Sequence, residues 1–384
     1  MPGRSVKVAI YVSELDVKGG THKQLLRLAQ ELLARRHEVQ IITPRHVPGQ
    51  GYPEFANLPI LTLPQRTGGG LLGKLRRGLR PARLAMRMGR VDVVNVHDNR
   101  GIMFGLVAKW LGKGRRYVWQ INDLDPAFKV GAHREQQRRT MRKVLQRIAN
   151  RWWARTVDAI TVNVGKNRER VMEYLSRDAE VLFCGVDFPE ANFQAQTAPG
   201  AFKLLTTGVF FPYRNYETLL QACALANKSL PVPIELTIVG DTRYTPEYVD
   251  RVRQLAKTTG VPLTIRENLS QADLDHQIAG SHAFAFVNVD QSWGLSVFEA
   301  AARTTPVILS RSVGAGELLN GKPGFLMVDP LSPQDIAAAI LSLAIDGERL
   351  RASAERARDT VKDMSWERLY CAPAMALFER LLKA

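Results

Sequence analysis

The sequence predicts an α/β protein built from two doubly wound parallel sheets. Short apolar, β-branched runs alternate with longer amphipathic segments from the start of the chain, as in VKVAIYV, THKQLLRLAQELLARR and EVQIIT. Because buried parallel strands are joined by covering helices, this alternation is typical of βαβ units. It continues to residue 187 and restarts after a linker-like stretch at residues 190–200. The restart predicts a second sheet with its own core.

The length of the chain agrees with two domains. The expected strands of the first sheet include VDVVNVH, RRYVWQI and DAITVNV, and those of the second include FKLLTTGVF, ELTIVG, LTIREN, AFAFVN and PVILS. At 384 residues the chain can form two domains of about 150–200 residues each. We therefore expect an N-terminal domain over residues 1–193 and a C-terminal domain over residues 203–366.

Composition and the start of the chain predict a cytoplasmic location. No stretch reaches about 18 consecutive apolar residues, and MPGRSVKVAIYVSE leads into a strand-like segment without a signal-peptide pattern. The three cysteines, Cys184, Cys223 and Cys371, are widely separated and lack the paired spacing of a zinc site or a disulfide framework. A reducing compartment fits this cysteine usage.

Positive charge is concentrated in the first half of the chain. Residues 1–200 carry 34 Lys and Arg against 17 Asp and Glu, whereas residues 201–384 carry 19 against 20. This asymmetry predicts an anionic partner for the N-terminal half, either a phosphorylated acceptor, a membrane surface or nucleic acid. Nucleic acid is the least favoured of the three, because the basic runs contain no recognisable binding module.

One basic run suggests a membrane surface. Residues 70–90 contain no acidic residue and interleave leucines with seven cations: Lys74, Arg76, Arg77, Arg80, Arg83, Arg87 and Arg90. A basic amphipathic segment of this kind is typical of peripheral attachment to an anionic inner membrane face. Gly78 and Pro81 weaken a helix, so a charged surface connection is the alternative. A second basic stretch, Arg134 to Arg155, adds Trp152 and Trp153, which suit either an interface or the core.

A short glycine loop follows the first expected strand. Gly19, Gly20, Thr21 and His22 precede an amphipathic helix, where glycines let the backbone approach a ligand and helix N–H groups favour an anion. A plain turn is the alternative, because the full G-x-G-x-x-G spacing is missing. His97, at the end of VDVVNVH, is interpreted as a structural histidine in preference to a catalytic base.

The most informative segment is DQSWGLSVFEAAARTTP, residues 290–306, which follows the expected strand AFAFVN. It places Gly294 and Leu295 at a helix N-terminus and Glu299 about one turn inside that helix. The N–H groups of such a turn can hold a diphosphate, and the carboxylate can accept hydrogen bonds from ribose hydroxyls. The segment therefore predicts a nucleotide site.

This segment resembles the E-x7-E region of the retaining GT-B glycosyltransferases of family four. The resemblance extends along the chain through LDVKGGTHKQLLRLAQELLARRHEVQIIT, DVVNVHDNRGIMFGLVAKWLG, LFCGVDF, TTGVFFPYRNYETLLQA, VILSRSVGAGELLNGKPGFLMVDPLSP and MSWERL. It implies two facing Rossmann-like domains, of which the first binds the acceptor and the second the nucleotide sugar. It also implies that a last helix, at residues 367–384, crosses back to the N-terminal domain.

The resemblance implies a role for each matching residue. It assigns catalytic roles to Arg214, Gln291, Asn122 and Asp123; donor binding to Gly20, Gly208, Arg214, Ser292, Trp293, Gly294, Leu295 and Glu299; and acceptor binding to Gly19, Thr21 and His22. The implied donor is a UDP- or GDP-sugar, and the implied acceptor is a glycan, a lipid-linked molecule or a small molecule. The implied reaction retains the anomeric configuration and needs no metal and no cofactor.

Several positions depart from the family pattern. Gln291 stands where the first Glu of E-x7-E is expected, Val209 where an Arg, Thr304 where a Gly, Asn122 where a His and Cys184 where an Asn is expected. Arg214 occupies the position of the family's Lys, so one cation for the leaving diphosphate remains. Because most of these changes remove a charged or functional side chain, a non-catalytic binding or partner subunit is the alternative function. A nucleotide-sugar epimerase is a weaker third possibility.

Overall fold

The chain divides into two compact units. The computed structural model describes residues 5–47, 49–63, 78–98, 101–122, 141–189, 193–196 and 200–384. Unit 1 comprises Met1–Cys184 and Trp366–Ala384, and unit 2 comprises Gly185–Ser365. Within the described ranges, no helix is both long and apolar enough to cross a membrane.

The described part of unit 1 contains a seven-stranded parallel sheet with the order β3-β2-β1-β4-β5-β6-β7. Its strands are β1 (Lys7–Tyr11), β2 (Glu38–Ile42), β3 (Ile60–Leu61), β4 (Val91–Val96), β5 (Gly114–Ile121), β6 (Ala159–Val162) and β7 (Glu180–Val181). Its helical segments before residue 184 are α1 (Gly20–Ala34), η1 (Pro53–Phe55), α3 (Arg80–Arg87), α4 (Ile102–Trp110), α5 (Met141–Thr156) and α6 (Gly165–Leu175). The strand order reverses between β1 and β4.

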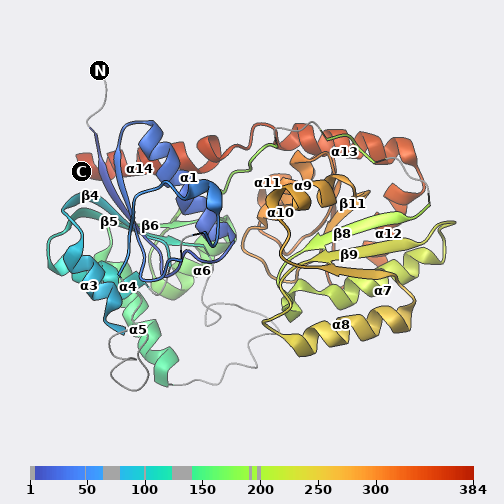
Figure 1. The fold of residues 1–384 in the computed structure, drawn as a ribbon, viewed down its shortest axis with the longest axis horizontal. Coiled ribbons are helices and arrows are strands. Elements are labelled where there is room, and N and C mark those ends of the chain that lie inside the picture. Colours follow the sequence, from blue (N-terminus) through green and yellow to red (C-terminus); the bar gives the residue numbers. More distant parts are fainter. Residues whose placement is uncertain are drawn as a thin grey trace. The chain divides into compact units, whose positions relative to one another are not determined.

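Helices cover both faces of this sheet. Figure 1 shows α1 on one face and α3, α4 and α5 on the other. On the second face Tyr11 stacks on Phe104 with ring centres 4.4 Å apart, and the fully buried Trp153 packs against Gly105, where a Cβ would lie 2.4 Å from the indole. Because the strands are buried on both sides, their continuous apolar runs are explained by position in the sheet.

The described part of unit 2 contains a six-stranded parallel sheet with the order β10-β9-β8-β11-β12-β13. Its strands are β8 (Phe202–Thr207), β9 (Ile234–Val239), β10 (Leu263–Arg266), β11 (Ala283–Phe286), β12 (Val307–Ser310) and β13 (Phe325–Val328). Its helical segments are η5 (Pro212–Arg214), α7 (Tyr216–Asn227), α8 (Pro246–Thr259), α9 (Gln271–Ala279), α10 (Leu295–Ala302), α11 (Gly316–Leu319), α12 (Pro333–Ala344) and α13 (Gly347–Val361). Here the order reverses between β8 and β11. Two doubly wound sheets with helical layers are thus confirmed.

The C-terminal segment belongs to unit 1, as the predicted crossing helix requires. A π-helical turn, η6 (Glu367–Cys371), leads into α14 (Ala372–Lys383). Trp366, Tyr370 and Phe378 are all at most 5% exposed, and Arg35 of α1 forms an ion pair with Glu367 at 2.8 Å. Although it is last in the chain, this segment therefore completes the core of the first unit.

The unit boundaries fall a few residues away from the predicted ones. Residues 185–189 and 193 belong to unit 2, whereas the prediction placed them in the N-terminal domain. The N–H of Val186 donates to the carbonyl of Met364 at 2.9 Å, and the Thr304 hydroxyl donates to the carbonyl of Phe193 at 2.8 Å. Trp366, which the prediction placed in the C-terminal domain, belongs to unit 1, where it packs against Tyr370.

We predict that Phe378→Ala destabilises unit 1 in particular. Removing a buried phenylalanine typically costs about 3–5 kcal/mol of unfolding free energy. Tryptophan fluorescence reports mainly on this unit, because it contains Trp110, Trp119, Trp152, Trp153 and Trp366 and unit 2 contains only Trp293. The urea concentration at the midpoint of the unfolding curve followed by fluorescence should therefore fall.

The matched control is Glu379→Ala, which alters the neighbouring exposed side chain of the same helix. Its unfolding free energy should stay within about 0.5 kcal/mol of the wild-type value. Equal midpoints for Phe378→Ala and Glu379→Ala would show that α14 does not stabilise unit 1.

Candidate functional site

The carboxyl edge of the unit 2 sheet brings most of the predicted donor residues together. Strands β8 and β11 are neighbours at the point where the strand order reverses. In doubly wound sheets, ligands bind outside this reversal because the connecting loops diverge there. Gly208 and Arg214 follow β8, and Gln291, Ser292, Trp293, Gly294, Leu295 and Glu299 follow β11.

Two glycines allow close backbone contact after β8 and β9. A Cβ on Gly240 would lie 1.8 Å from the carbonyl oxygen of Gly208, a separation that no side chain can adopt. The same carbonyl accepts a hydrogen bond from the Tyr216 hydroxyl at 3.0 Å. Sequence analysis did not single out Gly240, although a glycine directly after the strand ELTIVG was an available signal.

Arg214 is the cation at this edge. Its guanidinium carbon lies 5.2 Å from the ring centre of Tyr213 and 5.7 Å from that of Phe286. A Cβ on Gly208 would lie 2.5 Å from that carbon, so the glycine makes room for the cation. Among the described residues, Arg214 forms no ion pair and its buried Nε has no hydrogen-bond partner. A guanidinium in this setting is available to an anionic ligand.

Asn215 fixes the loop that carries Arg214. Its backbone is left-handed, with φ of 61°, a conformation in which asparagine is several-fold enriched. Its side-chain amide donates to the carbonyls of Val287 at 3.1 Å and Pro330 at 2.6 Å. The N–H of Val289 also donates to the carbonyl of Tyr213 at 2.9 Å. These bonds tie the β8 loop to the end of β11, a role that sequence analysis did not assign to Asn215.

The N-terminus of α10 lies beside the same aromatic ring. Gly294 precedes the helix with φ of 101°, and no side chain caps it. A Cβ at Gly294 would lie 3.0 Å from Cε1 of Phe286, the ring that Arg214 also faces. The first N–H groups of an α-helix have no intrahelical acceptor and favour anions. A cation and a helix N-terminus therefore both lie against the ring of Phe286.

Gln291 is oriented by its neighbours. Its backbone forms a bridge with Val313, and its carbonyl accepts the N–H of Gly314 at 3.1 Å. Its side-chain oxygen accepts a hydrogen bond from the amide of the buried Asn288 at 3.4 Å. Asn288 was absent from the predicted site. The contact uses the Gln291 side-chain oxygen and leaves its amide nitrogen as the hydrogen-bond donor of this side chain.

The Trp293 side chain is packed within unit 2. The indole is only 3% exposed and stacks on Phe298 with ring centres 4.9 Å apart, and the donor contact of this residue stays a prediction. We therefore assign this side chain to packing beneath α10. Ser292 is also buried, with 7% exposure.

Glu299 lies half-buried on α10, and a buried arginine holds that helix in place. The Arg303 guanidinium donates to the carbonyl of Glu299 at 2.9 Å and pairs with Asp275 of α9 at 2.7 Å. Arg303 is only 3% exposed. Because a buried cation must be satisfied, this contact fixes the position of α10 against α9.

The predicted acceptor loop lies at the reversal of the unit 1 sheet, between β1 and β4. Gly19 precedes α1, Gly20 and Thr21 begin it, and the His22 ring lies against Gly19, where a Cβ would meet Nδ1 at 3.2 Å. Asp98 holds the edge together by accepting the N–H groups of Ser13 at 2.7 Å and Gly101 at 2.8 Å. Gly20, predicted as a donor contact, thus lies in unit 1.

Two histidines near this loop are held neutral. Burial, with a smaller contribution from nearby His22, lowers the pKa of His97 to about 3. Burial also lowers the pKa of His22, against the opposing effect of nearby Glu14 and Asp98. Asn95 donates its amide to Nε2 of His97 at 3.1 Å, which leaves the imidazole proton on Nδ1. A fully buried neutral ring supports the structural interpretation of His97.

Asn122 lies in a buried polar network at the end of β5. Its side-chain oxygen accepts the amide of Gln120 at 2.9 Å, and Gln120 in turn accepts the Thr161 hydroxyl at 2.6 Å. Asn167 donates to the Asn122 carbonyl at 3.2 Å. Nδ2 of Asn122 is buried and has no partner in the described part of the chain. Asp123, predicted beside it, lies outside the described residues.

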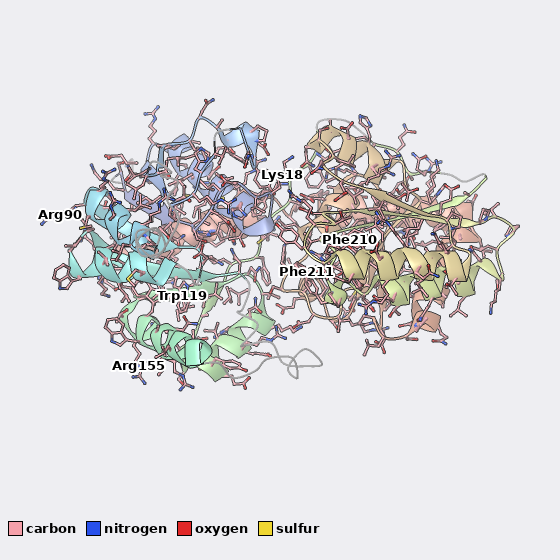
Figure 2. The ribbon with its side chains drawn as sticks, turned by 60° about the horizontal axis from the view of Figure 1, so that its bottom comes forward. Lys18, Arg90, Trp119, Arg155, Phe210 and Phe211 are labelled. Carbon is pink, nitrogen blue, oxygen red and sulfur yellow. The ribbon has the colours of Figure 1, made fainter. Side chains whose placement is uncertain are left out.

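The outer surface of α3, α4 and α5 is basic and apolar. These three helices contain no Asp or Glu. They expose Met86 (54%), Trp110 (84%), Ile148 (60%) and Trp152 (56%). Arg83, Arg87, Arg90, Arg151 and Arg155 are exposed among or beside them, and Figure 2 shows Arg90 and Arg155 on the surface of unit 1. We call this set of residues the acid-free face.

The acid-free face differs from the predicted segment at residues 70–90. Residues 70–77, with Lys74, Arg76 and Arg77, lie outside the described part. Arg80 is only half-exposed and donates to the carbonyl of Pro44 at 3.3 Å. Of the two tryptophans, Trp152 is exposed and Trp153 belongs to the core.

In the described residues, no group of three or more His, Cys, Asp or Glu side chains could hold a metal ion.

Comparisons with known proteins place both units in one class. The two sheets and the edge site define a GT-B protein. A family model described as Glycosyltransferase Family 4 matches residues 18–188, and one described as Glycosyl transferases group 1 matches residues 187–360. The chain belongs to the family-four glycosyltransferases, which are transferase enzymes.

Individual relatives span nearly the whole chain. The D-inositol 3-phosphate glycosyltransferase of Corynebacterium glutamicum is 25% identical over 91% of this chain and 88% of its own. The sucrose-phosphate synthase structure from Thermosynechococcus elongatus has a TM-score of 0.79 at 17% identity, covering 98% and 99% of the two chains. The structure of Anabaena HepE in complex with UDP and glucose has a TM-score of 0.74 at 16% identity, covering 97% and 99%.

The neutral His97 predicts a specific loss of stability in acid. Because its folded pKa of about 3 lies below its unfolded value of about 6.5, the stabilisation is present above pH 6.5 and is lost as the pH falls toward 3. Between pH 7 and 5 the wild type should lose about 2 kcal/mol more unfolding free energy than His97→Gln. Urea unfolding at the two pH values measures the difference. Parallel losses in the two proteins would contradict the burial of a neutral imidazole.

Proposed function

We propose that the chain transfers a sugar from a nucleotide sugar held by unit 2 to an acceptor hydroxyl held by unit 1, with retention of configuration and without a metal ion. The observation that carries this proposal is the Arg214 guanidinium, which has no ion-pair partner among the described residues and lies against Phe286, the ring that also meets the α10 N-terminus. Both groups stabilise the negative charge that develops on a leaving diphosphate. They supply the positive potential that a metal ion supplies in other transferases.

The other site residues have separate tasks in this proposal. Glu299 accepts hydrogen bonds from the ribose hydroxyls, and Gln291 donates its amide to a sugar hydroxyl. The bond between the anomeric carbon and the phosphate oxygen breaks on the face where the acceptor oxygen attacks. The acceptor's proton passes to the leaving phosphate, so no protein nucleophile is required. Asn122 and Asp123 contact the transferred sugar, and Gly19, Thr21 and His22 contact the acceptor.

The relatives support this donor and acceptor chemistry. HepE was solved with UDP and glucose, which agrees with a nucleoside diphosphate at the edge of unit 2. The name of the D-inositol 3-phosphate glycosyltransferase describes a small phosphate-bearing acceptor, which agrees with the positive charge of the N-terminal half. We therefore propose UDP- or GDP-sugars as donors and a polar, phosphate-bearing or lipid-linked molecule as acceptor.

A non-catalytic binding subunit is the competing function. Val209, Gln291 and Asn122 replace residues that carry charge or a proton in the family pattern. This alternative predicts nucleotide binding without turnover. Incubating the protein with a UDP- or GDP-sugar and the acceptor, followed by NMR of the anomeric proton of any product, separates the two functions and reports retention directly.

We predict different nucleotide-binding losses for the two charged donor residues. Arg214→Gln should weaken the binding of both UDP and inorganic pyrophosphate by about 1.5–3 kcal/mol, the range for a hydrogen bond to a charged group. Glu299→Gln should weaken the binding of UDP and leave the affinity for pyrophosphate unchanged, because pyrophosphate has no ribose. Isothermal titration calorimetry measures both ligands.

Arg253→Gln is the matched control for Arg214→Gln, because it removes an exposed arginine of α8 that is paired with Asp250. Its affinity for both ligands should equal that of the wild type. Unchanged UDP affinity in folded Arg214→Gln and Glu299→Gln would place the donor elsewhere.

We further propose that the acid-free face docks unit 1 on an anionic membrane. Exposed tryptophan suits the membrane interface, and each cation near an anionic leaflet contributes about 1 kcal/mol. Leu145, Ile148 and Trp152 follow the i, i+3, i+7 spacing of one helical face and are each more than half exposed. The absence of acidic residues from α3, α4 and α5 leaves these three helices without a carboxylate that would repel anionic lipid.

The membrane proposal predicts salt-sensitive flotation with phosphatidylglycerol vesicles. Replacing Arg83, Arg87 and Arg90 by Gln should weaken vesicle binding roughly 100-fold at low salt, from about 1 kcal/mol for each arginine. Wild-type binding should fall as salt shortens the Debye length to about 10 Å at 0.1 M.

The control variant replaces Arg253, Arg349 and Arg356, three exposed arginines of unit 2, by Gln and so has the same net charge. It should float like the wild type. A wild type that fails to float at low salt, or equal losses in the two triple variants, would sink the membrane proposal.

A further inference from the structure

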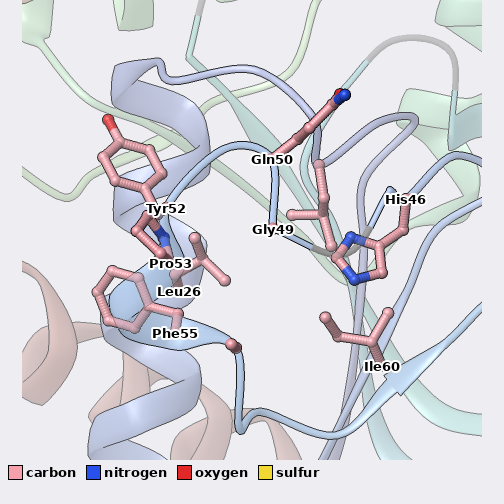
Figure 3. Close-up of a pocket in the computed structure, with 10 residues that line it drawn as sticks. Leu26, His46, Gly49, Gln50, Tyr52, Pro53, Phe55 and Ile60 are labelled. Atoms are coloured by element: carbon pink, nitrogen blue, oxygen red, sulfur yellow. The ribbon is translucent and has the colours of Figure 1, made fainter. Parts of the chain in front are cut away.

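Unit 1 contains a small cavity beside the predicted acceptor loop. It has a volume of about 80 Å³ and lies between α1 and the chain that joins β2 to β3. Its walls are formed by Leu15, Leu26, His46, Gly49, Gln50, Tyr52, Pro53, Phe55, Ala56 and Ile60. Figure 3 shows the His46 imidazole on one side, opposite Leu26 and Phe55. None of the side chains that line it is a carboxylate, an ammonium or a guanidinium group.

Apolar residues form most of the cavity wall, with the polar side chains of His46, Gln50 and Tyr52 among them. Leu15, Leu26 and Phe55 are each at most 5% exposed, so they form a buried apolar part of the wall. Nδ1 of His46 is buried and has no hydrogen-bond partner in the described part of the chain. An unpartnered buried polar atom costs stability unless a ligand or water satisfies it. The buried part of the wall therefore matches a small apolar group, with Nδ1 of His46 available to one hydrogen-bonding atom.

Contacts on both sides hold the walls in place. Asp16 accepts the N–H of Val47 at 2.6 Å and pairs with Arg45 at 2.8 Å. A Cβ on Gly51 would lie 2.4 Å from the carbonyl oxygen of Leu15, so the two loops touch through backbone alone. The cavity is thus formed in the absence of a ligand, which lowers the entropic cost of binding.

The other wall is held by α1. The Arg27 guanidinium lies 5.0 Å from the ring centre of Phe55, and Tyr52 packs edge-on against the same ring at 6.3 Å. The Tyr52 hydroxyl donates to the carbonyl of Gly19 at 3.3 Å. Gly19 begins the loop assigned to the acceptor. Tyr52 therefore connects the cavity wall to the loop at which we propose that the acceptor binds.

We propose that the cavity is an acceptor subsite for a small apolar substituent, such as a short or branched alkyl group attached to a sugar or polyol. This inference rests on the proposed function, because it assumes that the Gly19 loop binds the acceptor. An engineered cavity of about 150 Å³ holds benzene, so a cavity of about 80 Å³ holds about three or four carbons. The described lining contains no lysine or arginine, so the cavity offers no permanent cation to a phosphate group.

The test compares n-butyl β-D-glucoside with methyl β-D-glucoside as probes. Each buried methylene strengthens binding about fourfold, so the butyl compound should bind wild-type protein at least about tenfold more tightly in NMR titration. The imidazole signals of His46 should shift with the butyl compound and stay unchanged with the methyl compound. Equal affinities, or a preference without any shift at His46, would overturn the proposal.

The variant Ala56→Leu fills the mouth of the cavity from an exposed position, and Ala34→Leu makes the same change at an exposed site on α1 outside it. The butyl preference should disappear in Ala56→Leu and persist in Ala34→Leu. Its persistence in both variants would place the alkyl group elsewhere. UDP affinity, measured in parallel, tests the donor site separately, so failure of the proposed function and failure of this subsite give different results.

Discussion

The guanidinium of Arg214, held between two aromatic rings without a carboxylate partner in the described structure, is the interaction on which the donor site depends. A partly buried cation lowers the stability of the fold unless an anion pairs with it. Gly208 leaves room for it, Asn215 fixes its loop to the end of β11, and Phe286 contacts both the cation and the turn before α10. The arrangement is preorganised for the diphosphate that we propose as its ligand, because these contacts exist before a ligand binds.

Local sequence signals were sufficient for the fold and for part of this site. Alternating apolar and amphipathic runs predicted both parallel sheets, because strands buried on both faces need continuous apolar sequence. The glycine before an apolar helix in SWGLSVFEA predicted the uncapped N-terminus of α10, and its left-handed φ of 101° explains why glycine is required there. These features are encoded within a few residues and can be read without knowing the tertiary structure.

The rest of the site depends on partners that are distant in sequence. Gly240 is recognisable only once its contact with Gly208 on the neighbouring strand is known, and Asn215 only once its bonds to Val287 and Pro330 are seen. The burial of the Trp293 indole against Phe298 likewise depends on tertiary contacts that the local sequence does not reveal. The His46 cavity carried no sequence signal, because its walls come from separate loops.

The most direct measurement of the central claim is a crystal structure of the chain with UDP bound. The account predicts that diphosphate oxygens lie within about 2.7–3.2 Å of the Arg214 guanidinium and of a backbone N–H in the first turn of α10, with the ribose hydroxyls on Glu299. A UDP molecule bound away from this edge, with the Arg214 guanidinium still unpaired, would contradict it.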